Sequence, residues 1–337
     1  MSTARAWTVR EGLPRLTSAP TAPVENALDG DTRLIHVRYA GLCGSDLPKL
    51  HPTWNAPVPD PWFPGHEIVG LDALTGDWVT VDPLVSCRTC PDCEHGRTHL
   101  CRRLQRIGWD LPGGLAEAVR VPSSNVVRLP ALRDHAHGVL ADPMAVAVHG
   151  VRCGLRARSG RLGVIGSGAL GVCTAVRAAH AGWDVHLAAR SPARISQLRD
   201  ALASLNIDVH HRTLPNCDAV VDAASGHDDS PLRQAVAAVR DGGVVLVQNA
   251  YAPRVTLSLP LRKLFSRSIT VRGSFSYCRA DGHDDFRDAL VLLARGGAWA
   301  DLLTHDRYPL LELPSALAAM RRDSPNRPAK VLLTSNI

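Results

Sequence analysis

The chain has 337 residues, 45% of them hydrophobic and 21% charged, an ordinary composition for a globular protein. One compact core rarely serves a chain of this length, so two domains are expected. No run approaches the roughly 18 to 20 apolar residues that a membrane helix needs. The first ten residues lack the basic start and apolar stretch of a signal peptide, so we expect no membrane association and a cytoplasmic location.

The net charge is +6, from 38 basic and 32 acidic residues. The basic residues are scattered, and no aromatic-rich basic patch accompanies them. A dinucleotide is a sufficient anionic partner for such a surface, and a nucleic acid partner is not expected.

The segment from about residue 31 to 130 is strand-like and rich in loops. Its β-prone runs, separated by Gly, Pro and Asp, cover residues 34–39, 78–81 and 118–121. Residues 52–64 hold five prolines and two tryptophans, so an irregular loop is expected there.

Four of the nine cysteines crowd into the same part of the chain, as Cys87-x2-Cys90-x2-Cys93-x7-Cys101. Four thiolates in one loop suit a closed, tetrahedral structural zinc, which would fold a lobe (residues 85–103) too small and polar for its own core. An iron–sulfur cluster is the main alternative, and a zinc-finger-like nucleic acid binder is a more distant one because no basic recognition helix accompanies the lobe.

Near residue 142 the pattern changes to alternating strands and helices. Helices are expected at 144–150, 169–181, 193–205 and 232–239, and strands at 161–165, 184–188, 219–222, 243–248 and 268–272. This alternation predicts βαβ units around a parallel sheet. The tail returns to a helix, a loop and a final strand at 329–333.

A glycine motif, Gly166-Ser-Gly168-Ala-Leu-Gly171, joins the first strand of that series to the next helix. The glycines serve a tight turn, close approach to a pyrophosphate and close packing of helix on strand. The helix N-terminus then presents free N–H groups to the phosphates. We expect a dinucleotide site here; the alternative is an ordinary tight βα turn.

The end of the second strand distinguishes NAD from NADP. An acidic residue there would bind the ribose 2′-hydroxyl of NAD, but the sequence has Arg190-Ser191-Pro-Ala-Arg194. Arg190, Ser191 and Arg194 can hold a 2′-phosphate through charge-assisted hydrogen bonds. NADP is therefore favoured, with NAD still possible if both arginines are only solvated.

Candidate ligands for a second zinc occur in separate segments. They are Cys43, in Cys43-Gly-Ser45-Asp46, then His66, in Gly65-His66-Glu67, and Asp142, which precedes a proline. A Cys, His and carboxylate set leaves the fourth position open, as a catalytic zinc requires.

The run Gly65-His66-Glu67-x2-Gly70-x5-Gly76-x2-Val79 resembles the signature of zinc-containing alcohol dehydrogenases. With the other motifs in order, the chain resembles the medium-chain dehydrogenase/reductase superfamily on its polyol and secondary-alcohol side. The resemblance implies an α/β protein with a GroES-like catalytic domain (1–147), a Rossmann doubly wound parallel-sheet domain (148–278) and a tail (279–337) that completes the first domain.

The resemblance also implies residue roles. Cys43 and His66 match catalytic zinc ligands, and Asp142 falls where sorbitol-type enzymes carry a ligating glutamate. Glu67 matches an acid that can approach the metal during ligand exchange. Asp46 is placed to accept the other N–H of His66, and Ser45 matches the hydroxyl that takes the proton of the alcohol.

Two positions depart from the family pattern. Pro48 stands where some alcohol dehydrogenases pass the proton outward through a histidine, so the relay must end in water, the cofactor ribose or another group. Ser276 replaces an arginine that borders the substrate in sorbitol-type enzymes. Lys49 and His51 nevertheless indicate a polyhydroxylated substrate, unless they are merely solvated at the mouth of the cleft.

The expected function is hydride transfer between NADP(H) and a secondary alcohol or ketone, with a polyol, sugar or cyclitol as substrate. The alternatives are an NAD-dependent dehydrogenase of a simple secondary alcohol or a 3-hydroxy amino acid, a phosphorylated polyol as substrate, and a catalytically silent cofactor-binding relative. Relatives form dimers and tetramers, so a homo-oligomer is expected, with pairing near residues 243–248 and 268–272.

Overall fold

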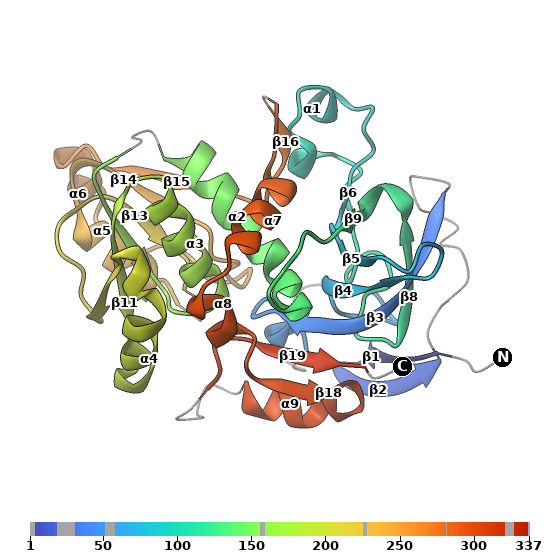
Figure 1. Cartoon of the computed structure of the whole chain (residues 1–337). Helices are drawn as coiled ribbons and strands as arrows, with labels where there is room; N and C mark the ends of the chain where they lie inside the picture. The colour runs from blue at the N-terminus through green and yellow to red at the C-terminus, as the bar shows by residue number, and fades with distance from the viewer. Residues whose placement is uncertain are drawn as a thin grey trace. The chain divides into compact units, whose positions relative to one another are not determined.

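The computed structural model describes residues 4–18, 31–50, 58–155, 159–224, 228–280, 282–320 and 327–335. His51 and the first part of the proline-rich segment lie outside these residues. The chain forms two compact units (Figure 1). Unit 1 comprises Met1–Asp142, Cys278–Gly296 and Leu303–Ile337, and unit 2 comprises Pro143–Tyr277 and Gly297–Leu302.

Unit 1 is built on a seven-stranded sheet in the order β18-β19-β3-β4-β5-β9, with β8 also paired to β3. Its strands are β3 (Thr32–Leu42), β4 (Glu67–Asp72), β5 (Trp78–Val81), β8 (Ala118–Pro122), β9 (Val126–Arg128), β18 (Arg307–Pro309) and β19 (Val331–Thr334). The three predicted strands before residue 130 are confirmed. The C-terminal strand also forms, and it pairs with β3, so the tail completes the N-terminal sheet.

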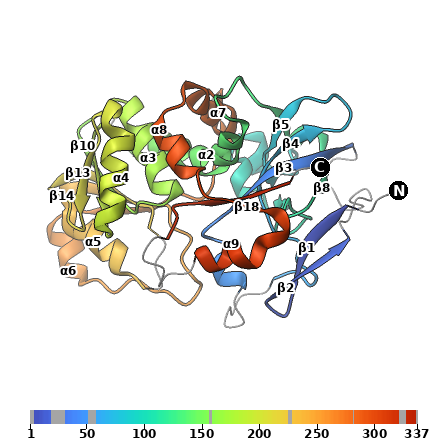
Figure 2. The ribbon, with the colours of Figure 1, turned by 60° about the horizontal axis from the view of Figure 1, so that its bottom comes forward.

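Shorter elements complete unit 1. Three two-stranded ribbons pair β1 (Arg5–Arg10) with β2 (Leu13–Ser18), β6 (Leu84–Val85) with β7 (Gln105–Arg106), and β16 (Arg279–Ala280) with β17 (His283–Asp284). The helices are α1 (Pro91–Glu94), α7 (Asp285–Arg295) and α9 (Leu313–Ala319), and the 3-10 turns are Leu47–Leu50, Thr98–Leu100, Ser123–Asn125, His135–Leu140 and Leu310–Glu312. Figure 2 shows α9 beside β18 and the β1–β2 hairpin. The sequence analysis did not anticipate that hairpin.

Unit 1 has a continuous apolar core between its strands. Ile35, Ile68, Val119 and Val331 come from four different strands and are fully buried or nearly so. This core holds the ends of β3, β4 and β19 in fixed register, and the candidate active site lies at those ends.

Unit 2 is a six-stranded parallel sheet in the order β12-β11-β10-β13-β14-β15. Its strands are β10 (Arg161–Ile165), β11 (Asp184–Ala189), β12 (Asp208–His211), β13 (Cys217–Asp222), β14 (Val239–Val247) and β15 (Thr270–Gly273). The strand order reverses between β10 and β13, which is the doubly wound Rossmann topology. The predicted α/β fold class, a GroES-like unit with a Rossmann unit, is thus confirmed.

Helices connect the strands of unit 2 by right-handed crossovers, so α3 and α4 cover one face and α5 the other (Figure 1). The crossover helices are α3 (Ala169–His180), α4 (Pro192–Leu202) with a 3-10 turn (Ala203–Leu205), and α5 (Ser230–Ala238). The other helices are α6 (Leu261–Ser266), α8 (Ala298–Leu303) and α2 (Ala141–His149), whose first two residues belong to unit 1 and which continues as a π-helical turn (Gly150–Gly154). None of the helices among the described residues is long and apolar enough to span a membrane.

Candidate active site and metal centres

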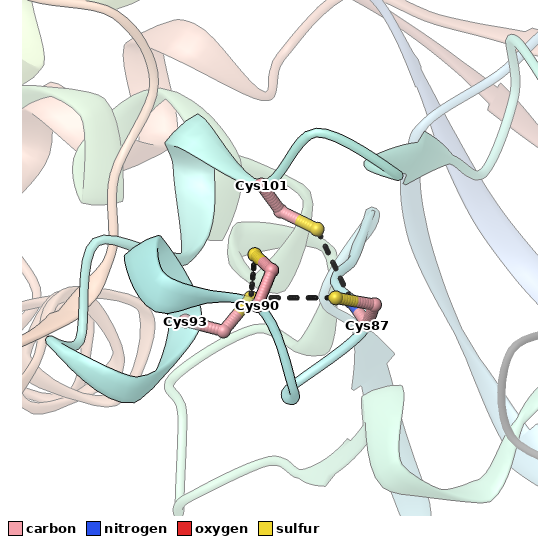
Figure 3. Close-up of side chains that lie close together, drawn as sticks. All are labelled: Cys87, Cys90, Cys93 and Cys101. Carbon is pink, nitrogen blue, oxygen red and sulfur yellow. Dashed lines mark hydrogen bonds between the residues drawn. The ribbon is translucent and has the colours of Figure 1, made fainter.

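The four clustered cysteines converge on one point of the lobe around α1 (Figure 3). The Sγ atoms of Cys90 and Cys93 are 3.5 Å apart, those of Cys87 and Cys93 are 4.0 Å apart, and the backbone N–H of Cys87 points to Cys101 Sγ at 3.3 Å. None of the four forms a disulfide. Their separations are those of sulfur atoms around one tetrahedral ion, so the lobe provides a structural zinc site.

The protonation of these thiols also fits a shared cation. The backbone N–H of Thr89 is the main cause that lowers the pKa of Cys87 to about 5, although partial burial opposes it. Burial and hydrogen bonds from neighbouring thiols raise the pKa of Cys93 to about 12. The cluster therefore keeps a proton on one sulfur to relieve repulsion between thiolates, and a divalent cation relieves the same repulsion more completely.

The second candidate centre is assembled by antiparallel pairing of β3 with β4. Gly41, near the end of β3, pairs with Glu67, the first residue of β4. Cys43 follows β3 and His66 precedes β4, so both lie at this edge of the sheet, and the ligand atoms of Cys43, His66 and Glu67 lie within 4.8 Å of one another. Asp142, in the first turn of α2, brings Oδ2 to 4.0 Å from His66 Nε2.

His66 is oriented by the carboxylate of Asp46. Its Nδ1 lies 3.5 Å from Asp46 Oδ1, which leaves Nε2 directed toward Asp142. Burial alone would lower the pKa of His66, but the negative charges of Asp46 and Cys43 raise it well above its usual value. The surroundings of His66 therefore stabilise a positive charge. Its imidazole, the thiol of Cys43 and the carboxylate of Asp142 together form a donor set that fits a divalent metal ion.

Ser45 lies in the turn that follows Cys43. Its hydroxyl donates to Cys43 Sγ at 3.2 Å, and its backbone N–H points to the same sulfur at 3.5 Å. The hydroxyl is therefore next to the proposed metal ligand, where the sequence analysis expects a proton acceptor.

Lys330 is a buried neighbour of this centre that the sequence analysis missed. It directly precedes β19, whose Val331 pairs with Leu42 of β3, and its Nζ forms an ion pair with Glu67 Oε2. Only 3% of Lys330 is exposed. Burial would lower the pKa of Lys330, but the charges of Glu67 and Cys43 raise it above its ordinary value.

A signal for Lys330 was present in the sequence. The chain has only three lysines among its 38 basic residues, and Lys330 directly adjoins an apolar strand. A second lysine, Lys49, also belongs to the site, with Nζ 3.9 Å from Asp46 Oδ1 and 3.9 Å from the ring centroid of Trp109. Two of the three lysines therefore lie beside the candidate catalytic residues.

The glycine motif has the geometry expected of a dinucleotide-binding loop. Gly166 follows β10 with a φ of +117°, and a Cβ there would lie 2.7 Å from the carbonyl oxygen of Ala223. A Cβ on Gly171 would lie 1.8 Å from the carbonyl oxygen of Gly166, so the helix can approach the loop only with glycine here. Gly168 caps α3 without a side-chain cap, and the space beside its Cα is open. The N–H groups of α3 thus remain available to an anion.

Arg190, Ser191 and Arg194 lie where β11 passes into α4. The Ser191 hydroxyl caps this helix by accepting from the backbone N–H of Arg194 at 3.4 Å. Arg190 is exposed, while Ser191 and Arg194 are half-buried. The three residues therefore lie at the carboxyl end of β11 and in the first turn of α4, and β11 pairs with β10, the strand that leads into the glycine loop.

Known proteins resemble this chain in sequence and in fold. A family model for the alcohol dehydrogenase GroES-like domain matches residues 29–131. The chain is 30% identical over 314 residues to 2-dehydro-3-deoxy-L-galactonate 5-dehydrogenase of Pseudoalteromonas atlantica, covering 86% of this chain and 88% of that protein. It is 30% identical over 307 residues to D-altritol 5-dehydrogenase of Agrobacterium fabrum, covering 83% and 86%.

A further relative and a solved structure agree. L-galactonate-5-dehydrogenase of Escherichia coli is 28% identical over 316 residues, covering 86% of this chain and 88% of that protein. The crystal structure of a zinc-binding dehydrogenase from Sinorhizobium meliloti, bound to NADP, shares the fold with a TM-score of 0.82 at 24% identity, covering 99% of this chain and 100% of that one.

The chain is therefore a zinc-type, NAD(P)-dependent alcohol dehydrogenase. It belongs to the zinc-containing alcohol dehydrogenases of the medium-chain dehydrogenase/reductase superfamily.

Mutations are expected to distinguish the structural role of the cysteine lobe from the catalytic role of the second metal centre. Both Cys43→Ala and Cys90→Ala should hold one zinc ion fewer per chain than the unaltered protein, as measured by elemental analysis. Only Cys90→Ala should lower the melting temperature markedly, because the lobe has no apolar core to replace the metal. Only Cys43→Ala should abolish turnover in an otherwise stable protein. Cys153→Ala, outside both clusters, is the control; turnover by Cys43→Ala would contradict the assignment.

The buried ion pair of Lys330 with Glu67 is expected to contribute to the free energy of unfolding. Lys330→Met leaves the carboxylate of Glu67 buried without its partner, which should lower the free energy of unfolding by about 3–5 kcal/mol. The double variant Lys330→Met/Glu67→Gln should recover most of this loss, since no buried charge remains. Urea denaturation measures both, with the exposed Lys263→Met as control. Equal losses in the single and double variants would show that the pairing is not the cause.

Proposed function

We propose that this chain oxidises a secondary hydroxyl of a polyhydroxylated substrate, a polyol, sugar or sugar acid, with NADP as the preferred cofactor, and catalyses the reverse reduction. The observation that carries this proposal is the cluster of Cys43, His66 and Asp142 with the Ser45 hydroxyl beside it. The names of three relatives, which describe dehydrogenases of galactonates and of altritol, support the substrate class.

Each protein group has a defined task in this proposal. Cys43, His66 and Asp142 would hold a zinc ion, which would supply a Lewis acid for the substrate oxygen. Asp46 fixes the tautomer and orientation of His66. The Ser45 hydroxyl would accept the proton of the alcohol and, because Pro48 cannot relay a proton, would release its own proton toward water.

Lys49 provides a recognition group for the substrate. Its ammonium is stacked on Trp109 and lies near Asp46, with Trp62 at 6.0 Å. Burial lowers the pKa of Lys49, although the charge of Asp46 opposes this shift. An ammonium held between an aromatic face and a carboxylate can donate to a substrate hydroxyl and, more strongly, to the carboxylate of a sugar acid.

Substrate panels with a lysine variant test this proposal. The zinc-loaded protein should oxidise L-galactonate, D-altritol or a close analogue, followed by the absorbance of reduced cofactor. Lys49→Met should raise the KM for a sugar acid at least about ten-fold, the loss of a hydrogen bond between charged groups, with a smaller effect on a neutral polyol. Lys263→Met is the matched control. If no polyol or sugar acid is oxidised while cofactor and zinc are bound, the proposed substrate class is overturned.

The preference for NADP rests on Arg190 and Arg194. They lie at the carboxyl end of β11, beside the strand that leads into the glycine loop, where a Rossmann fold binds the adenosine ribose. No carboxylate occupies the end of this strand, because Asp184 is its first residue. A 2′-phosphate therefore meets positive charge, and the 2′-hydroxyl of NAD meets no acidic acceptor there.

Cofactor titration distinguishes the two dinucleotides. Arg190→Ala should weaken NADP binding by about ten- to a hundred-fold, through the loss of a charge-assisted hydrogen bond, and leave NAD binding unchanged. Protein fluorescence measures both constants. Arg240→Ala is the matched control, since Arg240 lies near the amino end of β14. Equal weakening of NAD and NADP would contradict the 2′-phosphate assignment.

The chain is also proposed to form a homodimer through β15, the edge strand of the unit 2 sheet. Apolar side chains are exposed on this strand and its flanks, among them Val271, Phe275 and Phe265. The expected pairing near 243–248 is wrong, because β14 already has a neighbour on each side. Sedimentation at micromolar concentration should give a dimer or a tetramer; a monomer would overturn the proposal.

The thiolate-rich zinc lobe favours a reducing location such as the cytoplasm.

A further inference from the structure

A cluster of histidines and acids lies on the outer strands of unit 2, and no cofactor or catalytic role uses it. Asp184 and His186 belong to β11, and Asp208 and His210 to the edge strand β12. The two strands are parallel, with His186 paired to Asp208. Asp184 and Asp208 begin their strands, so the cluster lies toward the amino ends, whereas the glycine loop follows a carboxyl end.

Three side chains of this cluster present ligand atoms to one point. His186 Nδ1 is 2.8 Å from His210 Nε2 and 3.6 Å from Asp208 Oδ2, and the three ligand atoms lie within 4.8 Å of one another. Around a tetrahedral zinc ion with bonds of about 2.0–2.1 Å, neighbouring ligand atoms are roughly 3.3 Å apart. The cluster needs to open by only about half an ångström at the histidine pair to match this geometry.

The fourth member, Asp184, fixes the tautomer that metal binding requires. His186 Nε2 lies 3.2 Å from Asp184 Oδ2, so the ring donates its proton there and keeps the lone pair of Nδ1 toward His210 and Asp208. A carboxylate that accepts the outer N–H is the usual companion of a metal-binding histidine. Arg161, with Nε 3.2 Å from the same carboxylate oxygen, holds Asp184 in this outer position.

The burial of the group suits an ion that enters from solvent. The side chain of His186 is 8% exposed, whereas that of Asp208 is 70% exposed and can turn toward the ion. Two imidazoles and a carboxylate select zinc and related transition metals over calcium or magnesium.

We propose that His186, Asp208 and His210 form an additional zinc-binding site, separate from the cysteine lobe and the catalytic centre, with a water as the fourth ligand. Binding requires His210 to change tautomer: its Nε2, which faces His186 Nδ1, loses a proton to solvent, and its Nδ1 takes one up, so no net proton is lost. The ion links β12 to β11 through side chains and so stabilises the edge of the Rossmann sheet. Two positive charges lie nearby: Arg161 contacts Asp184, and Arg199 donates to the carbonyl oxygen of Val209 on β12 at 3.0 Å. They limit the affinity of the site for zinc, so it fills only when free zinc is plentiful.

Zinc counting on the holoprotein tests the proposal. The protein, with its cysteine lobe and catalytic centre loaded, is dialysed against about 10 μM free Zn²⁺, a concentration at which a micromolar site is mostly filled. One further zinc per chain is expected beyond those two, together with a higher melting temperature than at low free zinc. His210→Ala should lose both effects, while turnover at low free zinc stays unchanged.

A neighbouring histidine provides the matched control. His211 follows His210 on β12 but its side chain alternates to the opposite face and is exposed, so His211→Ala should bind the additional zinc like the unaltered protein. Asp184→Asn should weaken the site by about ten- to a hundred-fold, as the loss of an outer carboxylate does elsewhere. No additional zinc in the unaltered protein, or equal binding by His210→Ala, would overturn the proposal.

Discussion

The antiparallel pairing of β3 with β4 and β19 is the constraint on which the candidate active site depends. It brings the residue after β3, the residues at the start of β4 and the residue before β19 to one edge of the sheet. Cys43 and Glu67 are 24 positions apart in the numbering, and Lys330 is far from both, yet backbone hydrogen bonds hold all three segments in register. Loops alone would leave these side chains to move independently, which metal chemistry does not tolerate.

Charge balance explains why so many ionisable groups can be buried at this edge. Asp46, Glu67 and Lys330 are each at most 3% exposed, and burying any one of them alone would cost several kcal/mol. Each instead faces an opposite charge or an ionisable ring: Glu67 pairs with Lys330, and Asp46 faces His66 and Lys49. A divalent ion held, as proposed, by Cys43, His66 and Asp142 would add positive charge to a site that is otherwise rich in thiol and carboxylate groups. The buried ammonium of Lys330 thus holds the carboxylate of Glu67 in place and does not serve to bind substrate.

Whether a feature of this structure can be predicted from the sequence depends on how far apart its residues lie along the chain. The turn of the glycine loop and the clustering of the four cysteines can be predicted from the sequence because each motif is local, with all its residues within fifteen positions or fewer. The strand at 161–165 matches β10 for the same reason, since its apolar run and the glycines after it are adjacent. The site at Cys43, His66 and Asp142 required a resemblance to a known family, because nothing local joins its three segments.

The features that the sequence analysis missed also depend on residues that are far apart along the chain. Lys330 acquires its role only through the pairing of β19 with β3, which the predicted final strand did not specify. The β1–β2 hairpin was missed because its strands, with residues such as Arg15 and Thr17 exposed, lack a clear apolar alternation. Long-range pairing is a tertiary property, and side-chain periodicity records it only where one face of a strand is buried.

The sheet of unit 2 shows how one topology can separate two kinds of site. All six strands are parallel, so their carboxyl ends share one edge, where Gly166 and Arg190 lie and where we propose that the dinucleotide binds. The amino ends share the opposite edge, where no crossover helix presents its N-terminus and a phosphate gains nothing from backbone N–H groups. Imidazoles and carboxylates on adjacent strands suit a cation there instead. Because the two edges are a full strand length apart, a cation bound at His186 and His210 can stabilise the sheet without entering the hydride-transfer chemistry.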